Sequence, residues 1–203
     1  MSCAPPTVEG SAPLCHHARV PDSLTGKLLV ASPLIEEATF RRTVVFLCAH
    51  GPNGAFGLVI NRPTAAPVAN HLASWLDVVS SPSVLFQGGP VEASRAFGLG
   101  EKRPGAEFGG WMDVGAGIGL IDLAQDVGEA AAGLLGLRIF HGYAGWAAEQ
   151  LEGEIANDGW FVVDSRVSDL FQPDPSALWR EVLRRQSGRA ALFANFPASP
   201  NVN

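Results

Sequence analysis

The sequence His141–Asp158, HGYAGWAAEQLEGEIAND, changes its hydrophobic pattern in the middle. It overlaps the apolar run Leu137–His141, which predicts a buried β-strand. The glycine-flanked segment Gly142–Gly145 then predicts a turn, and the periodicity of Ala147–Asn157 predicts an amphipathic helix. A further apolar run, Trp160–Asp164, predicts another strand. Strand, turn, helix and strand in this order indicate helices packed on a sheet.

The predicted helix has distinct faces when its residues are placed about 100° apart. Its buried stripe is predicted to be Ala147, Ala148, Leu151 and Ile155, and one flank carries Trp146, Gln150, Glu154 and Asn157. We expect this flank to face a cleft shared with Gly142–Gly145. The alternative is that Glu and Gln at a helix margin contact only water or an arginine.

The rest of the chain predicts strands first and then strands alternating with helices. The predicted strands are Lys27–Ala31, Thr43–Cys48, Ala55–Asn61, Ser83–Gln87, Ala96–Gly100 and Gly117–Leu123. The predicted helices start near Pro67 and end before Ser80, run from the cap Asp126 to about Leu135, and start at the cap Asp174 with Pro175. We expect His50–Gly54 to be a hairpin turn and Gly115–Gly119 to be a flexible loop. The pattern predicts an α+β (mixed α/β) single domain over 23–198, a disordered arm over 1–22 and a flexible tail over 199–203.

Composition narrows the class of protein. The chain has 203 residues, a formal charge of −6 and three cysteines, Cys3, Cys15 and Cys48. So few cysteines predict no disulfide framework and a cytoplasmic location. We expect no membrane span, because no uninterrupted apolar stretch approaches the roughly 18 residues that a span requires. We expect no direct nucleic-acid contact, because the cluster Arg180, Arg184, Arg185 and Arg189 is more typical of a solvated helix face.

Common catalytic signatures are absent from the sequence, which contains no Gly-x-Ser-x-Gly, His-Glu-x-x-His, Walker loop or Cys-x-x-Cys. Cys15-His16-His17 lacks a second pair of ligands at the spacing of a zinc site, so we expect no metal and no cofactor.

Two polar loops are candidate binding elements. Asn61-Arg62-Pro63 could end a strand, or its Arg62 could hold a carboxylate or phosphate. Gln87-Gly88-Gly89-Pro90 could be a tight turn packed on another backbone, or its N–H groups could bind an anion.

Tyr143, the only tyrosine, could face a ligand or fill a gap. Cys48 and His50, two residues apart on one strand, could form an activated thiol or be ordinary core residues.

These motifs resemble those of the YqgE/AlgH proteins, a bacterial family, from about Gly26 to about Arg185. The resembling segments are Gly26–Ala31, Phe40–Val45, Gly57–Pro63, Gln87–Val91, Gly142–Trp146 and Gln150–Glu152. Leu178-Trp179 and Leu183–Gln186 are similar to the actinobacterial branch. The resemblance implies a bifurcated, partly barrel-like mixed β-sheet surrounded by helices, and no known cofactor.

The chain also departs from that family pattern. The family often has glycine at the position of Glu149, and an acid at the position of Ala49, between the Cys and the His. His141 occupies a position expected to be apolar. Some members are labelled transcriptional regulators, but nothing in this sequence resembles a helix-turn-helix, so we do not transfer that label.

We therefore expect a non-enzymatic binding or regulatory module whose polar loops converge on one cleft and bind an unknown protein or a small molecule. Its predicted ligand-binding residues are Asn61, Arg62, Gln87, Gly88, Gly89, Tyr143, Trp146, Gln150 and Glu154. The alternative is a small-molecule enzyme or a thiol redox protein that uses Cys48 with His50, or Arg62 with Glu154.

Overall fold

The structure is a computed structural model that describes residues 23–196, so the expectations for 1–22 and 199–203, Cys15-His16-His17 included, lie outside the described residues. The strands are β1 (Lys27–Ala31), β2 (Val44–Gly51), β3 (Gly54–Val59), β4 (Pro63–Pro67), β5 (Val84–Gln87), β6 (Val91–Lys102), β7 (Trp111–Gly115), β8 (Ile118–Ile121), β9 (Leu134–Trp146) and β10 (Trp160–Asp164). The 3₁₀ helices are η1 (Val68–Asn70) and η2 (Ala73–Val78). The α-helices are α1 (Val127–Gly133), α2 (Gln150–Ala156), α3 (Val167–Leu170), α4 (Leu178–Arg184) and α5 (Gly188–Phe193).

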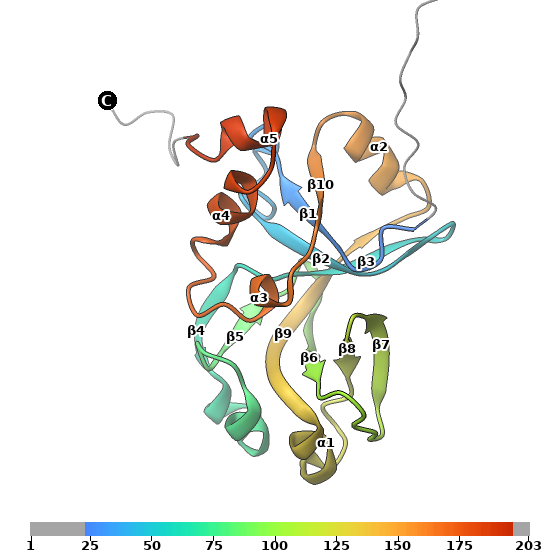
Figure 1. Cartoon of the computed structure of the whole chain (residues 1–203), viewed down its shortest axis with the longest axis vertical. Coiled ribbons are helices and arrows are strands. Elements are labelled where there is room, and N and C mark those ends of the chain that lie inside the picture. The colour runs from blue at the N-terminus through green and yellow to red at the C-terminus, as the bar shows by residue number, and fades with distance from the viewer. Residues whose placement is uncertain (1–22, 197–203) are drawn as a thin grey trace, which may run out of the picture.

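The strands form one curled, mixed sheet in the order β10-β1-β2-β3-β9-β6-β8-β7, with β4 and β5 attached beside β9. All its strand pairs are antiparallel except β5 with β9. In Figure 1 the strands β1, β2, β3 and β10 form an upper lobe, and β4 to β8 form a lower lobe. The expected α+β single domain is therefore confirmed.

Strand β9 joins the two lobes. It pairs with β6 along most of its length and with β5 at Phe140 and His141. Its last residues, from Ala144 to Trp146, pair instead with β3. Because one strand exchanges partners along its length, the sheet forks at this point, which confirms the expected bifurcation (Figure 1).

The upper lobe is buried on both faces, which explains its uninterrupted apolar strands. Along β2, Val44 and Phe46 belong to the core covered by α3, α4 and α5. Their neighbours Val45 and Leu47 belong to a second core, which Leu151 of α2 covers. Side chains of a strand alternate between the two faces of the sheet, so the residues that point to either face must be apolar here.

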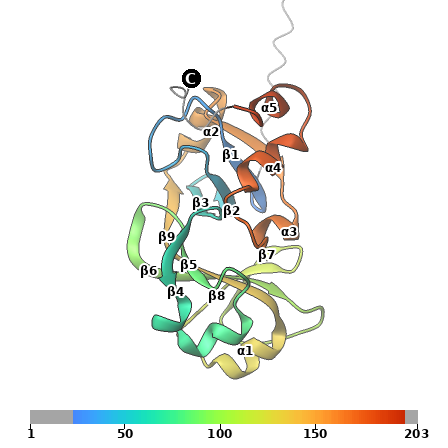
Figure 2. The same cartoon turned by 90° about the vertical axis from the view of Figure 1, so that its left-hand side faces the viewer.

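The lower lobe has its own core at the opposite end of the molecule. Trp75 of η2 and Ala130 of α1 pack against Leu137 and Ile139 of β9. Figure 2 shows α1 at this end, far from α2, α4 and α5. The side chain of Asp126 accepts a hydrogen bond from the N–H of Gly128 at 2.8 Å, so the predicted cap of α1 is confirmed.

The helix predicted to start near Pro67 and end before Ser80 is not continuous. Pro63–Pro67 is strand β4, and two short 3₁₀ helices, η1 and η2, follow it. Pro63 therefore begins a strand. Strand β4 pairs only with β5, and an edge strand tolerates proline because one side of its backbone needs no partner.

The turn predicted at Gly142–Gly145 is also wrong, because this segment continues β9. Gly142 adopts a φ of +68°, which bends the strand without ending it. Helix α2 starts only at Gln150, and Ala147 and Ala148 are exposed, so they are not part of a buried stripe. Pairing with β3 and β6 overrides the local preference of the glycines for a turn.

The remaining elements agree with the prediction, differ from it in extent or were not predicted. The predicted hairpin of β2 and β3 is present, and β10 has its predicted bounds. Strand β7 and helices α3 and α5 were not predicted. Gly115–Gly117 is the turn of the β7–β8 hairpin, and helix α4 starts at Leu178, after a turn in which Asp174 accepts from the N–H of Ser176.

No helix within residues 23–196 is long and apolar enough to cross a membrane.

Candidate functional site

The two polar loops meet each other and strand β9 through their backbones, where the sheet forks. The N–H of Gln87 donates to the carbonyl of Arg62 at 2.9 Å, and the N–H of Gly88 donates to the carbonyl of His141 at 2.9 Å. The carbonyl of Gly88 accepts from the N–H of Val59 at 2.8 Å. These contacts form a junction of strands.

Close packing explains the two glycines of this junction. A Cβ at Gly88 would lie 2.3 Å from the carbonyl oxygen of Gly142, and a Cβ at Gly89 would lie 2.1 Å from the carbonyl carbon of Tyr143. Real Cβ atoms do not approach backbone this closely. The N–H of Gly88 is already used within the sheet, so the packed-turn interpretation accounts for both glycines.

Asn61 and Arg62 also serve the fold. Asn61 is buried; its Oδ1 accepts from the N–H of Val44 and its Nδ2 donates to the carbonyl of Arg42, both at 2.9 Å. Arg62 donates to the carbonyl of Arg41 at 2.5 Å. Burial lowers the pKa of Arg62, and the charge of Arg41 lowers it further. No acid pairs with Arg62 within the described residues.

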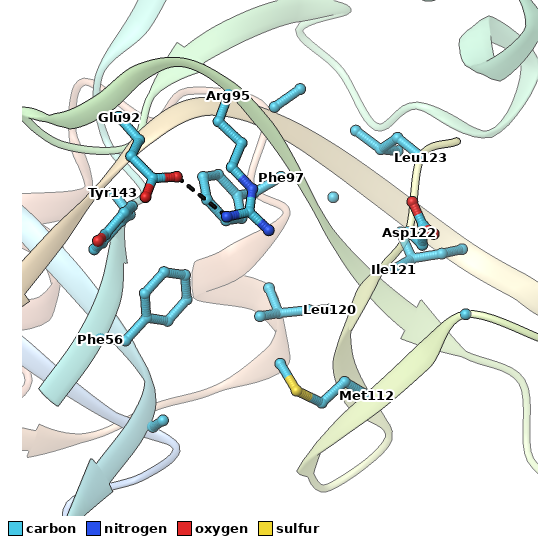
Figure 3. A pocket seen from close by; sticks show the side chains of 14 residues that line it. Phe56, Glu92, Arg95, Phe97, Met112, Leu120, Ile121, Asp122, Leu123 and Tyr143 are labelled. Carbon is cyan, nitrogen blue, oxygen red and sulfur yellow. Dashed lines mark hydrogen bonds and ion pairs between the residues drawn. The ribbon is translucent and has the colours of Figure 1, made fainter. Parts of the chain in front are cut away.

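A pocket of about 610 Å³ lies beside the fork and receives walls from both lobes (Figure 3). We call it the fork pocket. The side chains that define its character are Phe56, Glu92, Arg95, Phe97, Met112 and Tyr143. Its volume falls in the range of small-molecule sites, roughly 300–1,000 Å³.

Three aromatic rings form one wall of the fork pocket. The ring of Phe56 lies 4.8 Å from that of Tyr143 and 5.6 Å from that of Phe97, measured between centroids. The guanidinium of Arg95 lies 5.1 Å above the centroid of Phe97 and pairs with Glu92 at 3.1 Å. Figure 3 shows Arg95 pointing from its strand toward this wall.

A bulge in β6 places Arg95 over the pocket. Between Val91 and Ala96 strand β6 advances five residues, while β9 advances two, from Tyr143 to His141. The three additional residues loop out of the ladder, and Glu92 adopts a φ of +47° there. Bulges of this kind redirect side chains, and here the redirected side chains are those of the ion pair.

A second pocket, of about 350 Å³, lies over α2 and contains the predicted flank. We call it the tryptophan pocket. It is lined by Gly145, Trp146, Gln150, Glu154 and Asn157, together with Glu37, Phe40 and Trp160. The helical wheel therefore grouped these side chains correctly, although α2 is shorter than predicted. The segment Gly142–Gly145 was expected to share a cleft with this flank, and Gly145 lines the tryptophan pocket.

Glu154 is the polar centre of the tryptophan pocket. Its Oε2 accepts from the indole N–H groups of Trp146 at 2.9 Å and Trp160 at 2.8 Å. Its Oε1 accepts from Nε2 of Gln150 at 3.0 Å. All three donors are neutral, and no ion pair joins Glu154 to a basic side chain in the part of the chain that the structure describes.

Neither predicted catalytic pair is formed. Cys48 is buried, and burial raises the pKa of its thiol well above the usual range, which opposes a reactive thiolate. A bulge between Leu47 and Ala49 breaks the strand alternation on which the pairing of Cys48 with His50 depended. His50 instead accepts from the N–H of Leu24 and contacts Glu152 at 2.9 Å. Among the described residues no hydrogen bond joins Arg62 to Glu154.

The predicted site residues thus lie in three places. Asn61, Arg62, Gln87, Gly88 and Gly89 form the junction, Tyr143 lines the fork pocket, and Trp146, Gln150 and Glu154 line the tryptophan pocket. The sequence did not predict the other fork-pocket side chains, or Trp160. Within residues 23–196 no group of three or more His, Cys, Asp or Glu side chains is placed to hold a metal ion.

Two of the four clustered arginines serve the fold. Arg185 holds Asp169 with two hydrogen bonds, at 2.5 and 2.6 Å, and Arg189 pairs with Asp158 at 2.7 Å. Arg180 and Arg184 are exposed, as a solvated helix face requires.

A forked, mixed β-sheet whose two lobes are joined by strand β9, with its bend at Gly142, defines the structural class of this domain. Comparison with known proteins gives its family. A family model described as AlgH-like matches residues 28–191. The chain is 44% identical over 185 residues to a UPF0301 protein of Streptomyces avermitilis, covering 89% of this chain and 96% of the relative. It is 39% identical over 181 residues to a UPF0301 protein of Mycobacterium marinum, covering 88% and 90%.

Solved structures agree with these sequence comparisons. A crystal structure of a protein from Corynebacterium diphtheriae matches with a TM-score of 0.80 at 30% identity, covering 84% of this chain and 91% of that one. The solution structure of the AlgH protein from Pseudomonas aeruginosa matches with a TM-score of 0.63 at 28% identity, covering 95% and 100%. The chain belongs to the AlgH-like family, and the resemblance stated from its motifs is confirmed.

Proposed function

We propose that this chain is a binding module, without catalytic activity of its own, that holds a small amphipathic ligand in the fork pocket. The observation that carries the proposal is the combination of an aromatic wall with one guanidinium above it. Concave sites lined by apolar side chains with few polar groups are the usual form of small-molecule sites.

The side chains indicate which ligand fits. A planar apolar group matches the wall of Phe56, Phe97 and Tyr143. An anionic group matches Arg95, whose present partner Glu92 is held only weakly because both side chains are exposed. A ligand carboxylate can therefore replace Glu92 at small cost.

The remaining expectations belong to this proposal. A cytoplasmic location rests on the cysteine content alone. A nucleic-acid ligand is not proposed, because Arg185 and Arg189 are engaged with Asp169 and Asp158. A regulatory role would require a protein partner.

The test uses 2-naphthoate and its uncharged analogue 2-naphthamide, followed by amide chemical shifts in two-dimensional NMR. We expect 2-naphthoate to shift the amides of Gly98 and Tyr143, and Arg95→Gln to weaken its binding about tenfold without changing that of 2-naphthamide. Met112→Glu, at the exposed pocket mouth, should also weaken 2-naphthoate through charge repulsion.

Arg184→Gln is the matched control, because this exposed arginine of α4 does not line the pocket. Shifts confined to other regions, or equal binding to wild type and Arg95→Gln, would show that the fork pocket is not the site.

A further inference from the structure

The tryptophan pocket has a chemistry opposite to that of the fork pocket. Its charged side chains are both acidic, Glu37 at the rim and Glu154 within, and no Lys, Arg or His lines it. Its apolar wall consists of Phe40, Trp146 and Trp160, whose ring centroids lie between 5.7 and 6.4 Å apart. Aromatic faces and carboxylates are the two groups that attract organic cations.

The hydrogen bonds of Glu154 orient its carboxylate and leave its charge uncompensated. Trp146, Trp160 and Gln150 supply three neutral donors, which fix both oxygens in position. A carboxylate can accept about four hydrogen bonds, so one acceptor site remains after these three. Oε2 already accepts from two indoles, and the remaining site is therefore on Oε1, beside Gln150.

This geometry also selects the shape of the cation. A guanidinium binds a carboxylate best with two parallel hydrogen bonds, which needs both oxygens. In this pocket only Oε1 is available, and a compact ammonium group needs only one acceptor. The apolar part of such a ligand would lie along Phe40 and Trp160, which form the adjacent wall.

We propose that the tryptophan pocket binds the ammonium group of a small alkylammonium ligand, with Oε1 of Glu154 as its acceptor. This site is separate from the fork pocket in residues, ligand charge and sheet face, so each proposal can fail without the other.

The experiment uses the indole N–H signals of the five tryptophans as internal reporters. The full chain is titrated with n-butylammonium chloride at pH 7, and 1-butanol serves as the uncharged probe of similar shape. We expect n-butylammonium to shift the indole signals of Trp146 and Trp160 in a saturable manner, with a Kd on the order of 1 mM. The indoles of Trp75 and Trp179 donate to the backbone carbonyls of Leu123 and Ala31 and should not move.

Two variants separate binding from folding. Glu154→Gln keeps the size of the side chain but removes its charge, and we expect it to weaken n-butylammonium at least about tenfold. Unchanged signals of Trp75 and Trp179 would verify that this variant is folded. Glu37→Gln lies at the exposed rim, where a folding defect is not expected, and should weaken binding severalfold.

Glu36→Gln is the matched control, because this neighbouring acid is exposed and does not line the pocket. The proposal is overturned if 1-butanol shifts the same two indoles as strongly as n-butylammonium does. It is equally overturned if n-butylammonium shifts neither indole, or if folded Glu154→Gln binds it as well as wild type.

Discussion

Replacement of Gly88 by alanine tests whether the fork of the sheet depends on close backbone packing. The new Cβ would lie 2.3 Å from the carbonyl oxygen of Gly142 and 3.1 Å from side-chain atoms of Leu58 and Phe140. Gly88 does not adopt a positive φ, so the penalty is steric and not conformational. Overpacking costs typically about 1–3 kcal/mol, and we expect about 3 kcal/mol because backbone, unlike a side chain, cannot rotate away.

Thermal unfolding followed by circular dichroism measures this change. At this chain length 1 kcal/mol corresponds to roughly 2–4 °C in Tm, so Gly88→Ala should lower Tm by about 6–12 °C. The matched control is Gly153→Ala, in helix α2, where a Cβ would meet nothing within 4 Å. Alanine in a helix interior is favoured over glycine by about 0.5–1 kcal/mol, so this variant should melt about 1–4 °C higher. A Tm of Gly88→Ala within about 2 °C of wild type would refute the reasoning.

Three further changes test other parts of the fold. Asp169→Asn should reduce the unfolding free energy by about 3 kcal/mol because it removes the charge of a buried carboxylate that Arg185 holds, whereas Asp158→Asn, in an exposed pair, should cost less than about 1 kcal/mol; urea denaturation compares the two. Burial raises the pKa of the Cys48 thiol, so the folded state keeps its proton while the unfolded thiol ionises above about pH 8.5. The contribution of this thiol to the unfolding free energy should therefore be fully present below that pH and fall above it by up to about 1.4 kcal/mol per pH unit. Cys48→Ala should lose this slope, and equal slopes in the two proteins would contradict the assignment. Glu149 adopts a φ of +62°, and Glu149→Gly should stabilise the fold by about 0.5 kcal/mol in the same urea assay, while Glu149→Ala, which keeps the strain, should not.

The sequence predicted the strands of the upper lobe well because the reason for their pattern is local. Apart from Lys27 and Asp164, Lys27–Ala31 and Trp160–Asp164 are apolar runs of strand length, and burial on both faces favours this composition. The flank of α2 was predicted for a similar reason. Gln150 and Glu154 are four residues apart, and a helix places such residues on one face wherever it begins.

The fork pocket could not be predicted because its side chains meet only through the fold. Phe56, Phe97 and Tyr143 lie on three different strands. Arg95 reaches the pocket through a bulge that depends on pairing with β9, and no local pattern of β6 indicates it. Glu149 is a different case, because the glycine that the family often has at this position indicates a left-handed backbone conformation.

The error at Gly142–Gly145 explains why one cleft was expected where the structure has two pockets. A turn would direct Tyr143 and Trp146 toward a shared surface, whereas a strand directs residues three apart to opposite faces. Tyr143 accordingly packs with the core on the fork-pocket side, and Trp146 packs with the core beneath α2. The motif that identifies the family is thus a strand with a pocket on each face, and the glycine bend at Gly142 lets that strand pass from one lobe to the other. A variant at Arg95 should therefore leave the indole signal of Trp146 unchanged, because the sheet itself separates the two pockets.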